Sequence, residues 1–288
     1  MKNKIVFISG ASGGIGKACA EYFAKDGANL IICSRNMEKL NDFRDFLINS
    51  YGVNVLAIEL DVKNREKVVE TIENLDENWK NIDILINNAG LAKGLEKLYE
   101  GNLDDFEDMI DTNIKGLLYL TRQIVPLMIE RKGHVINIGS TAGIIAYPNG
   151  TVYCATKAAV KFISDGLRMD LVDKEIKVTN IQPGMVETDF SVVRFKGDKN
   201  KADNFYKGIE PLTAEDIADI EYQRALAGVS RAKAGLGEIG VYQSYSRITA
   251  PISGIITQKN MGKPVAGTVT LLAGPQHTSS MLLMRSLY

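Results

Sequence analysis

The sequence predicts an α/β fold in which helices cover both faces of a doubly wound parallel sheet. Three observations lead to this prediction. Six short apolar segments alternate with amphipathic helical segments. A glycine-rich loop directly follows the first apolar segment. Small or polar residues follow several later segments, where the carboxyl ends of parallel strands would meet. A chain of 288 residues can bury one large core and carry an appendage.

Composition narrows the function classes. The formal net charge of −1 gives no reason to expect nucleic acid as a partner. Three cysteines and two histidines are scattered in no metal-ligand spacing, so we expect no metal site. No stretch approaches the length of a membrane span, and the apolar run 5–8 is too short for a signal peptide. We therefore expect a cytoplasmic protein with no membrane span.

The first predicted strand, residues 4–9, leads into a glycine loop and then a helix that ends near Lys25. A strand, a glycine loop and a helix together place a pyrophosphate on backbone N–H groups at the helix N-terminus. The spacing here is Gly-x-x-x-Gly-x-Gly. The loop residues we expect to contact a dinucleotide are Gly10, Ser12, Gly14, Ile15 and Gly16.

The second predicted strand, 29–33, ends in Ser34 and Arg35. An acidic residue at this strand end would hold a ribose 2′-hydroxyl, whereas an arginine would pair with a 2′-phosphate. Arg35 therefore points to NADP as the cofactor. The alternative is a solvated arginine that opens the next helix, 37–50.

The next two predicted strands, 53–60 and 82–86, flank a helix over 63–79 and end in residues that suit a cofactor cleft. Small and amide groups allow the backbone to lie against a flat ring. The candidate cofactor-binding residues at these ends are Asp61, Val62, Asn87, Ala89 and Gly90.

A long helical region over 101–131, broken only by Pro126, contains Asn113 on a stretch that should be buried. Asparagine has poor helix propensity. Asn113 is therefore either a satisfied core amide or a polar group placed for a proton relay.

The fifth predicted strand, 133–139, is followed by Ser140 and by a helix over 152–172 that carries Tyr153 and Lys157. Residues four apart on a helix lie one turn apart on the same face. An ammonium at that distance would favour the phenolate and lower the pKa of Tyr153. The hydroxyl of Ser140 could hold a carbonyl oxygen while the tyrosine proton moves. Taken alone, Tyr-x-x-x-Lys also occurs on helix surfaces.

The sixth predicted strand, 176–181, leads to Pro183 and Gly184. A charged region of loop and short helices, 185–211, follows and includes Thr188, which we expect at the cofactor. Ligands of open α/β sheets lie beyond the strand carboxyl ends, so this region is a natural substrate lid. Thr213 and Asp216 are spaced as a capping box before one more helix.

In this order, these motifs resemble those of the classical short-chain dehydrogenases/reductases over residues 1 to about 220. The resemblance implies a Rossmann-like sheet and an Asn113–Ser140–Tyr153–Lys157 tetrad. It implies that Tyr153 is the general acid/base and that Lys157 lowers its pKa and binds the nicotinamide ribose. Ser140 would orient the substrate oxygen, and Asn113 would hold a water in the proton relay. The family also implies a homo-oligomer, a dimer or tetramer, formed through the helices near 102–130 and 152–172.

Within that family, the segment 185–198, the stretch 147–150 and Arg35 resemble the NADP-dependent 3-hydroxy acid and serine dehydrogenases. A cationic lid suits a carboxylate substrate, so Arg194 or Lys196 could hold it. The alternative is that both side chains are solvated. The implied reaction is hydride transfer between NADP(H) and a small hydroxy acid or its carbonyl form.

From residue 221 onward the family pattern stops. Residues 222–270 resemble a fragment of a periplasmic adaptor, or membrane fusion protein, of efflux pumps. We therefore divide the chain into a dehydrogenase domain, 1–220, and an atypical tail, 221–288, which is either a fusion segment or a divergent end in which residues 267–273 supply the last strand. The alternative function is a non-catalytic NADP-binding or adaptor-like assembly protein.

Overall fold

The computed structural model describes residues 1–208, 210–233 and 269–270. They form an α/β fold around a parallel sheet in the order β3-β2-β1-β4-β5-β6-β7, as the sequence predicts. The chain winds outward in both directions from β1 and β4, which is the doubly wound arrangement. The strands are β1 (Ile5–Ser9), β2 (Asn29–Ser34), β3 (Val55–Glu59), β4 (Ile84–Asn87), β5 (His134–Ile138), β6 (Lys177–Gln182) and β7 (Val269–Thr270).

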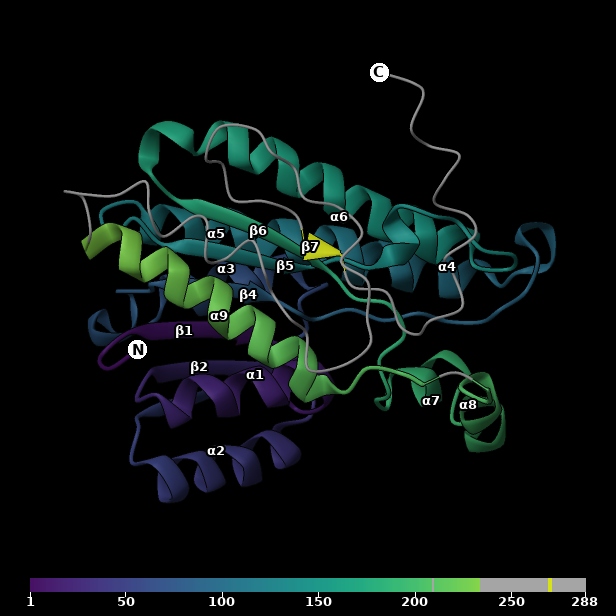
Figure 1. Cartoon of the computed structure of the whole chain (residues 1–288), viewed down its shortest axis with the longest axis horizontal. Helices are drawn as coiled ribbons and strands as arrows, with labels where there is room; N and C mark the ends of the chain where they lie inside the picture. Colours follow the sequence, from purple (N-terminus) through teal and green to yellow (C-terminus); the bar gives the residue numbers. More distant parts are fainter. Residues whose placement is uncertain (209, 234–268, 271–288) are drawn as a thin grey trace.

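Helices cover both faces of the sheet (Figure 1), and a layer of buried apolar side chains fills the space on each face. One layer lies under α1 (Gly14–Lys25), α2 (Met37–Tyr51) and α9 (Ala214–Lys233). The other lies under α3 (Arg65–Glu73) and α5 (Leu117–Met128), with α6 (Thr151–Asp170) beside β6. Every residue of β1 is buried, because a strand between two helical layers has no solvent face.

Two helical segments differ from the prediction. The helix expected over 63–79 ends at Glu73, and a separate turn, η1 (Glu77–Trp79), follows. The region 101–131 consists of α4 (Leu103–Ile110), a π-helical stretch η3 (Asp111–Gly116) and α5, and Pro126 lies inside α5 without breaking it. Pro126 stands in the last turn of α5, where its missing N–H removes a single helical hydrogen bond. The irregularity falls instead at η3, which contains Asn113.

Short elements gather at the carboxyl ends of the strands. Figure 1 shows α7 (Phe190–Arg194) and α8 (Lys199–Phe205) as a separate group at one end of the molecule. They fall within the region 185–211, which the sequence analysis proposes as a substrate lid. The remaining short helices are η2 (Leu98–Glu100), η4 (Thr141–Gly143) and η5 (Val172–Lys174).

The capping box before α9 is confirmed. The backbone N–H and hydroxyl of Thr213 both donate to the Asp216 carboxylate, and the Asp216 N–H donates to the Thr213 hydroxyl at 3.1 Å. The expected boundary between residues 220 and 221 lies inside α9, which packs on α1 through Phe23 and Tyr222, whose ring centroids are 5.6 Å apart.

Most of the segment that resembles an adaptor, 222–270, lies outside the described residues. Its first residues belong to α9. Its last two form β7, which pairs in parallel with β6. This short strand falls within the 267–273 stretch that was the alternative source of a last strand.

Candidate active site

A cavity of about 740 Å³ opens where the strands end. That volume is in the range of pockets that hold cofactors and drug-sized ligands. Residues from the glycine loop, from the ends of β2 to β6 and from the lid all line it. Of the predicted site residues, the lining includes Gly10, Ser12, Gly14, Ile15, Arg35, Asp61, Val62, Ala89, Gly90, Ser140, Tyr153, Lys157, Pro183, Gly184 and Thr188.

The glycine loop has the geometry that its sequence predicts. Gly10 and Gly14 have φ values of 69° and 50°, in the left-handed region that favours glycine. Gly16 is required for a different reason. A Cβ there would lie 2.4 Å from Nδ2 of Asn88 and 2.5 Å from the Gly10 carbonyl oxygen. Gly16 allows α1 to pack closely against Gly10 and Asn88, and it does not line the cavity.

The start of α1 suits a phosphate. Its N-cap, Gly13, has no side chain to accept a hydrogen bond from the first N–H groups of the helix, so these groups keep their donors for a ligand. A Cβ built at Gly14 would lie 3.3 Å from the Thr188 side chain, so the beginning of the lid lies directly over this loop. The loop, the uncapped helix and the cavity volume together fit a dinucleotide.

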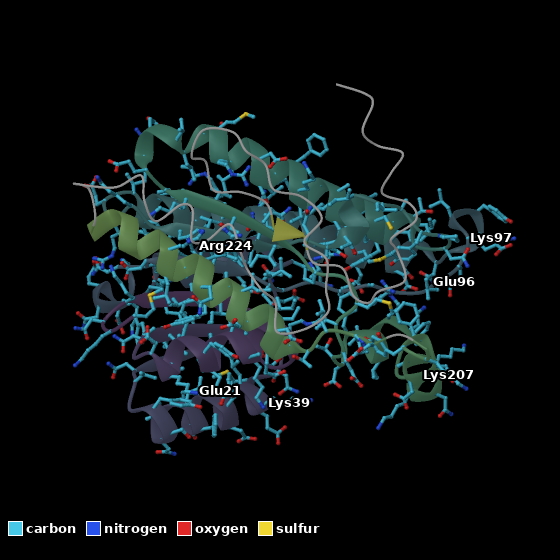
Figure 2. All side chains as sticks on the ribbon, viewed as in Figure 1. Glu21, Lys39, Glu96, Lys97, Lys207 and Arg224 are labelled. Carbon is cyan, nitrogen blue, oxygen red and sulfur yellow. The ribbon has the colours of Figure 1, made fainter. Side chains whose placement is uncertain are left out.

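At the far end of the cavity, Arg35 and Lys39 lie beyond β2 and are both exposed; Figure 2 labels Lys39 on α2. Arg35 forms no ion pair with any residue that the structure describes. Its guanidinium is therefore available to an anionic ligand, as the 2′-phosphate prediction requires.

Asn87 and Asn113 use their side chains inside the protein. The Asn87 amide donates to Thr121 at 3.0 Å and to Asn137 at 2.9 Å, and Asn87 does not line the cavity. The Asn113 side chain accepts from the Leu91 N–H and donates to the Leu91 carbonyl, both at 2.8 Å, and it also donates to Thr156. Of the two alternatives for Asn113, the satisfied buried amide describes its side chain.

Ser140, Tyr153 and Lys157 meet at the cavity. Ser140 follows β5, and its hydroxyl accepts the Ala142 N–H at 3.1 Å. Tyr153 and Lys157 stand one turn apart on α6, with the Lys157 ammonium 5.9 Å from the centre of the Tyr153 ring. Lys157 is buried and donates to the Ile138 carbonyl at 2.8 Å, which fixes the position of its ammonium.

Burial dominates the titration of this group of residues. It raises the pKa of Tyr153 to about 12, against the opposing effects of the Arg194 guanidinium and then of the Ser140 hydroxyl. It also lowers the pKa of Lys157 to about 8. The sequence predicted a lowered tyrosine pKa because of Lys157. The direction is opposite here because desolvation of the phenolate outweighs the effect of the Arg194 guanidinium.

The two lid cations proposed for substrate lie in different surroundings. Lys196 does not reach the cavity, and its ammonium pairs with Asp105 at 2.7 Å. Arg194 is only 5 % exposed. Its guanidinium carbon lies 5.0–5.9 Å from the centres of four aromatic rings. The rings belong to Tyr147, Tyr153, Phe190 and Phe205.

Arg194 has no acidic partner among the described residues. It donates to the Tyr147 hydroxyl at 2.9 Å, and its Nε has no partner. It lines a second cleft of about 20 Å³, and Tyr153 lines both this cleft and the main cavity. A buried arginine without a counter-ion, 5.0 Å from the Tyr153 ring centre, is suited to bind an anion there.

The sequence analysis missed the residues that surround this guanidinium. Tyr147 and Phe190 entered it only as parts of the stretches 147–150 and 185–198, and Phe205 only as part of the lid region 185–211. Aromatic residues near a lid arginine are a weak signal, because sequence spacing does not show which rings will meet.

A family model described as short chain dehydrogenase matches residues 4–199. The chain belongs to this family. The glycine loop and the Ser140, Tyr153 and Lys157 side chains of this short-chain dehydrogenase all lie on the main cavity.

Curated relatives and a solved structure resemble the chain closely. An NADP-dependent 3-hydroxy acid dehydrogenase of Salmonella typhi is 48% identical over 217 residues, which is 75% of this chain and 86% of that protein. A Schizosaccharomyces pombe protein of the same description is 43% identical over 222 residues, covering 76% and 86%. The closed form of serine dehydrogenase complexed with NADP+ matches with a TM-score of 0.73 and 45% identity, covering 76% and 88%.

Within the described part of the short-chain dehydrogenase, no three His, Cys, Asp or Glu side chains are grouped so that they could hold a metal ion. No helix in that same part is long and apolar enough to cross a membrane.

Proposed function

We propose that the protein transfers a hydride between NADP(H) and a small hydroxy acid or its carbonyl form. One observation carries the proposal: Ser140, Tyr153 and Lys157 line the same cavity as an uncapped helix N-terminus and a glycine loop that fit a dinucleotide. The relatives named as NADP-dependent 3-hydroxy acid dehydrogenases support the same cofactor and substrate class.

NADP, when bound, would supply the hydride for reduction and accept it in oxidation. The glycine loop would hold its pyrophosphate, Arg35 its 2′-phosphate, and Lys157 its nicotinamide ribose. Thr188 and the turn at Pro183 and Gly184 would lie over it.

Tyr153 moves the proton. In the reduction, the Tyr153 hydroxyl gives its proton to the substrate carbonyl oxygen as the hydride reaches the carbonyl carbon, and Ser140 holds that oxygen. In the oxidation, the phenolate takes the proton from the substrate hydroxyl. Because the pKa of Tyr153 is about 12, the proton-donating form dominates at neutral pH. Oxidation should therefore be faster at alkaline pH.

Asn113 would contribute to the tetrad through its backbone and through the position it gives to its neighbours. Its side chain is fully used in holding Leu91 and Thr156. It lies in the π-helical stretch η3, where the helical hydrogen-bond pattern is interrupted. A water of the proton relay would therefore be held by backbone groups rather than by the Asn113 amide.

The hydroxy acid class is supported by Arg194. A carboxylate on its guanidinium would compensate a buried charge that has no other acidic partner among the described residues. Lys196 is not proposed for this role, because its ammonium pairs with Asp105 outside the cavity.

The test is NADP reduction at alkaline pH with L-serine, L-allo-threonine and 3-hydroxypropionate, comparing the intact protein with Tyr153→Phe. We expect turnover that the substitution lowers by at least about 100-fold. NADP should still raise the melting temperature of the variant. Turnover that survives the substitution would overturn the assignment of Tyr153. NADP stabilisation without turnover on any small alcohol or carbonyl would favour the alternative, a non-catalytic NADP-binding or adaptor-like protein.

We also propose a homo-oligomer in the cytoplasm. Large apolar side chains stand exposed on the helices that the family resemblance assigns to the interface: Leu103 on α4, Leu118 on α5, and Phe162 and Met169 on α6. The three cysteines are unpaired, which suits a reducing compartment. Light scattering after gel filtration measures the oligomeric state, and a monomer at micromolar concentration would contradict the proposed homo-oligomer.

A further inference from the structure

Lys196, which the sequence offered as a substrate ligand, has a different set of contacts. Its ammonium lies 2.7 Å from a carboxylate oxygen of Asp105, on α4. The Asp105 side chain is 10 % exposed, so this carboxylate is poorly solvated and depends on its cationic neighbours. The other one is Lys93, at 3.8 Å. The closest cation to Asp105 therefore comes from the lid.

Asp105 belongs to a chain of alternating charges that runs toward the body of the domain. Lys93 pairs with Asp108 as well as with Asp105, and Asp108 pairs with Lys63 at 2.7 Å. These two lysines hold the pKa of Asp108 at about 2, well below its usual value. This series of ion pairs links the β3–α3 loop, the loop after β4, and α4. Lys196 is the one lid residue in it among those described.

The backbone of Lys196 is held in an uncommon conformation. Its φ is 53°, at the position after α7 where glycine or asparagine is favoured. Two hydrogen bonds close this end of the helix, from Lys196 N–H to the Val193 carbonyl and from Gly197 N–H to the Val192 carbonyl. A lysine is disfavoured in this left-handed position, so helix capping alone does not account for it.

The same end of α7 carries Arg194. The Arg194 carbonyl accepts the Gly94 N–H at 3.0 Å, from the loop that also holds Lys93. That loop, α4 and Arg194 together line the small cleft beside Tyr153. Figure 2 labels Glu96 on this loop. The hydrogen bond to Asp105 and the charge of Asp105 raise the pKa of Lys196, and the Glu96 carboxylate acts in the same direction. Contacts of Lys196 thus bear directly on where Arg194 lies.

We propose that Lys196 and Asp105 are positioning residues, an ion pair that holds α7 against α4 and so keeps Arg194 beside Tyr153. The proposal rests on the proposed function for its catalytic consequence. When the pair is removed, a smaller fraction of molecules has the lid in the closed position. The apparent affinity for a carboxylate substrate falls in proportion to that fraction.

The test uses Lys196→Asn, Asp105→Asn and the double variant. Asparagine is tolerated in the left-handed position, so Lys196→Asn removes the charge without worsening the helix end. Lys201→Asn is the matched control, because Lys201 is 70 % exposed on the lid and its ion pair within the described residues is local, with Asp198 at 3.6 Å.

We expect KM for the hydroxy acid to rise about fivefold in each single variant, the upper end for a partly exposed ion pair. The double variant should rise no further than Asp105→Asn alone, since Lys196 has then already lost its partner. kcat and the melting temperature should change little. Additive effects in the double variant, or KM values equal to those of Lys201→Asn, would overturn the proposal.

Hydrogen exchange of the segment 190–205 separates this proposal from the proposed function, because it needs no turnover. Lys196→Asn and Asp105→Asn should speed exchange in this segment, while Lys201→Asn should not. Faster exchange in a protein with no dehydrogenase activity would keep the positioning role and reject the function. Unchanged exchange in all three variants would reject the positioning role.

Discussion

Replacing Arg194 with methionine tests the hydroxy acid assignment most directly. Methionine keeps an unbranched apolar chain among the four rings and removes the charge. Arg194 is 5 % exposed, so its bonds to a carboxylate are little weakened by solvent screening. A hydrogen bond to a charged group is worth about 1.5–3 kcal/mol. At about 1.36 kcal/mol for each factor of ten, kcat/KM for the hydroxy acid should fall roughly 10- to 150-fold.

The assay compares two substrates at saturating NADP. A neutral secondary alcohol has no carboxylate, so its kcat/KM should fall far less than that of the hydroxy acid. Arg65→Met is the matched control, because Arg65 is an exposed arginine on α3 whose recorded ion pair is with the adjacent Glu66. It should change neither value.

A second effect of Arg194→Met has a definite sign. The Arg194 cation opposes the rise in the pKa of Tyr153, so its removal should raise that pKa further. The alkaline limb of the oxidation profile should then move to higher pH. An equal loss of activity on the neutral alcohol and the hydroxy acid would refute the reasoning, since the carboxylate would then not be the group that Arg194 binds.

Two other predictions concern the cofactor and stability. Arg35→Asp should lower kcat/KM with NADP by about tenfold or more and raise it with NAD, because the variant loses a partner for the 2′-phosphate; unchanged preference in steady-state assays would remove that assignment. Glu221 is buried, with a carboxylate oxygen 2.9 Å from the Cys19 thiol, and burial raises its pKa to about 8. Because the folded protein holds this proton more tightly than the unfolded chain does, protonation of Glu221 stabilises the fold. That stabilisation is complete below the usual glutamate pKa and is lost as pH rises through about 8. The melting temperature of the wild type should therefore fall relative to that of Glu221→Gln between pH 5 and pH 9, and parallel melting curves would contradict this.

The sequence by itself determined the order of elements and the position of the cleft. Alternation of apolar strands and amphipathic helices depends on local spacing, and the strands β1 to β6 lie where that spacing predicts. The glycine loop and the residues at strand ends follow from the same logic, since parallel strands bring their carboxyl ends to one edge of the sheet. Ser140 lies there for that reason, and Tyr153 and Lys157 reach the same cavity from the first two turns of α6.

Tertiary structure decided which polar groups were already in use. Asn87 and Asn113 look available in the sequence, but they bond to residues 34 and 22 positions away. Lys196 is paired with Asp105, while Arg194 bonds to Tyr147, 47 residues earlier, and keeps an unpartnered Nε. The pKa of Tyr153 likewise depends on how much of the chain covers it. Sequence spacing gives the neighbours of a residue along one element, whereas burial and ion pairing depend on segments that only folding brings together.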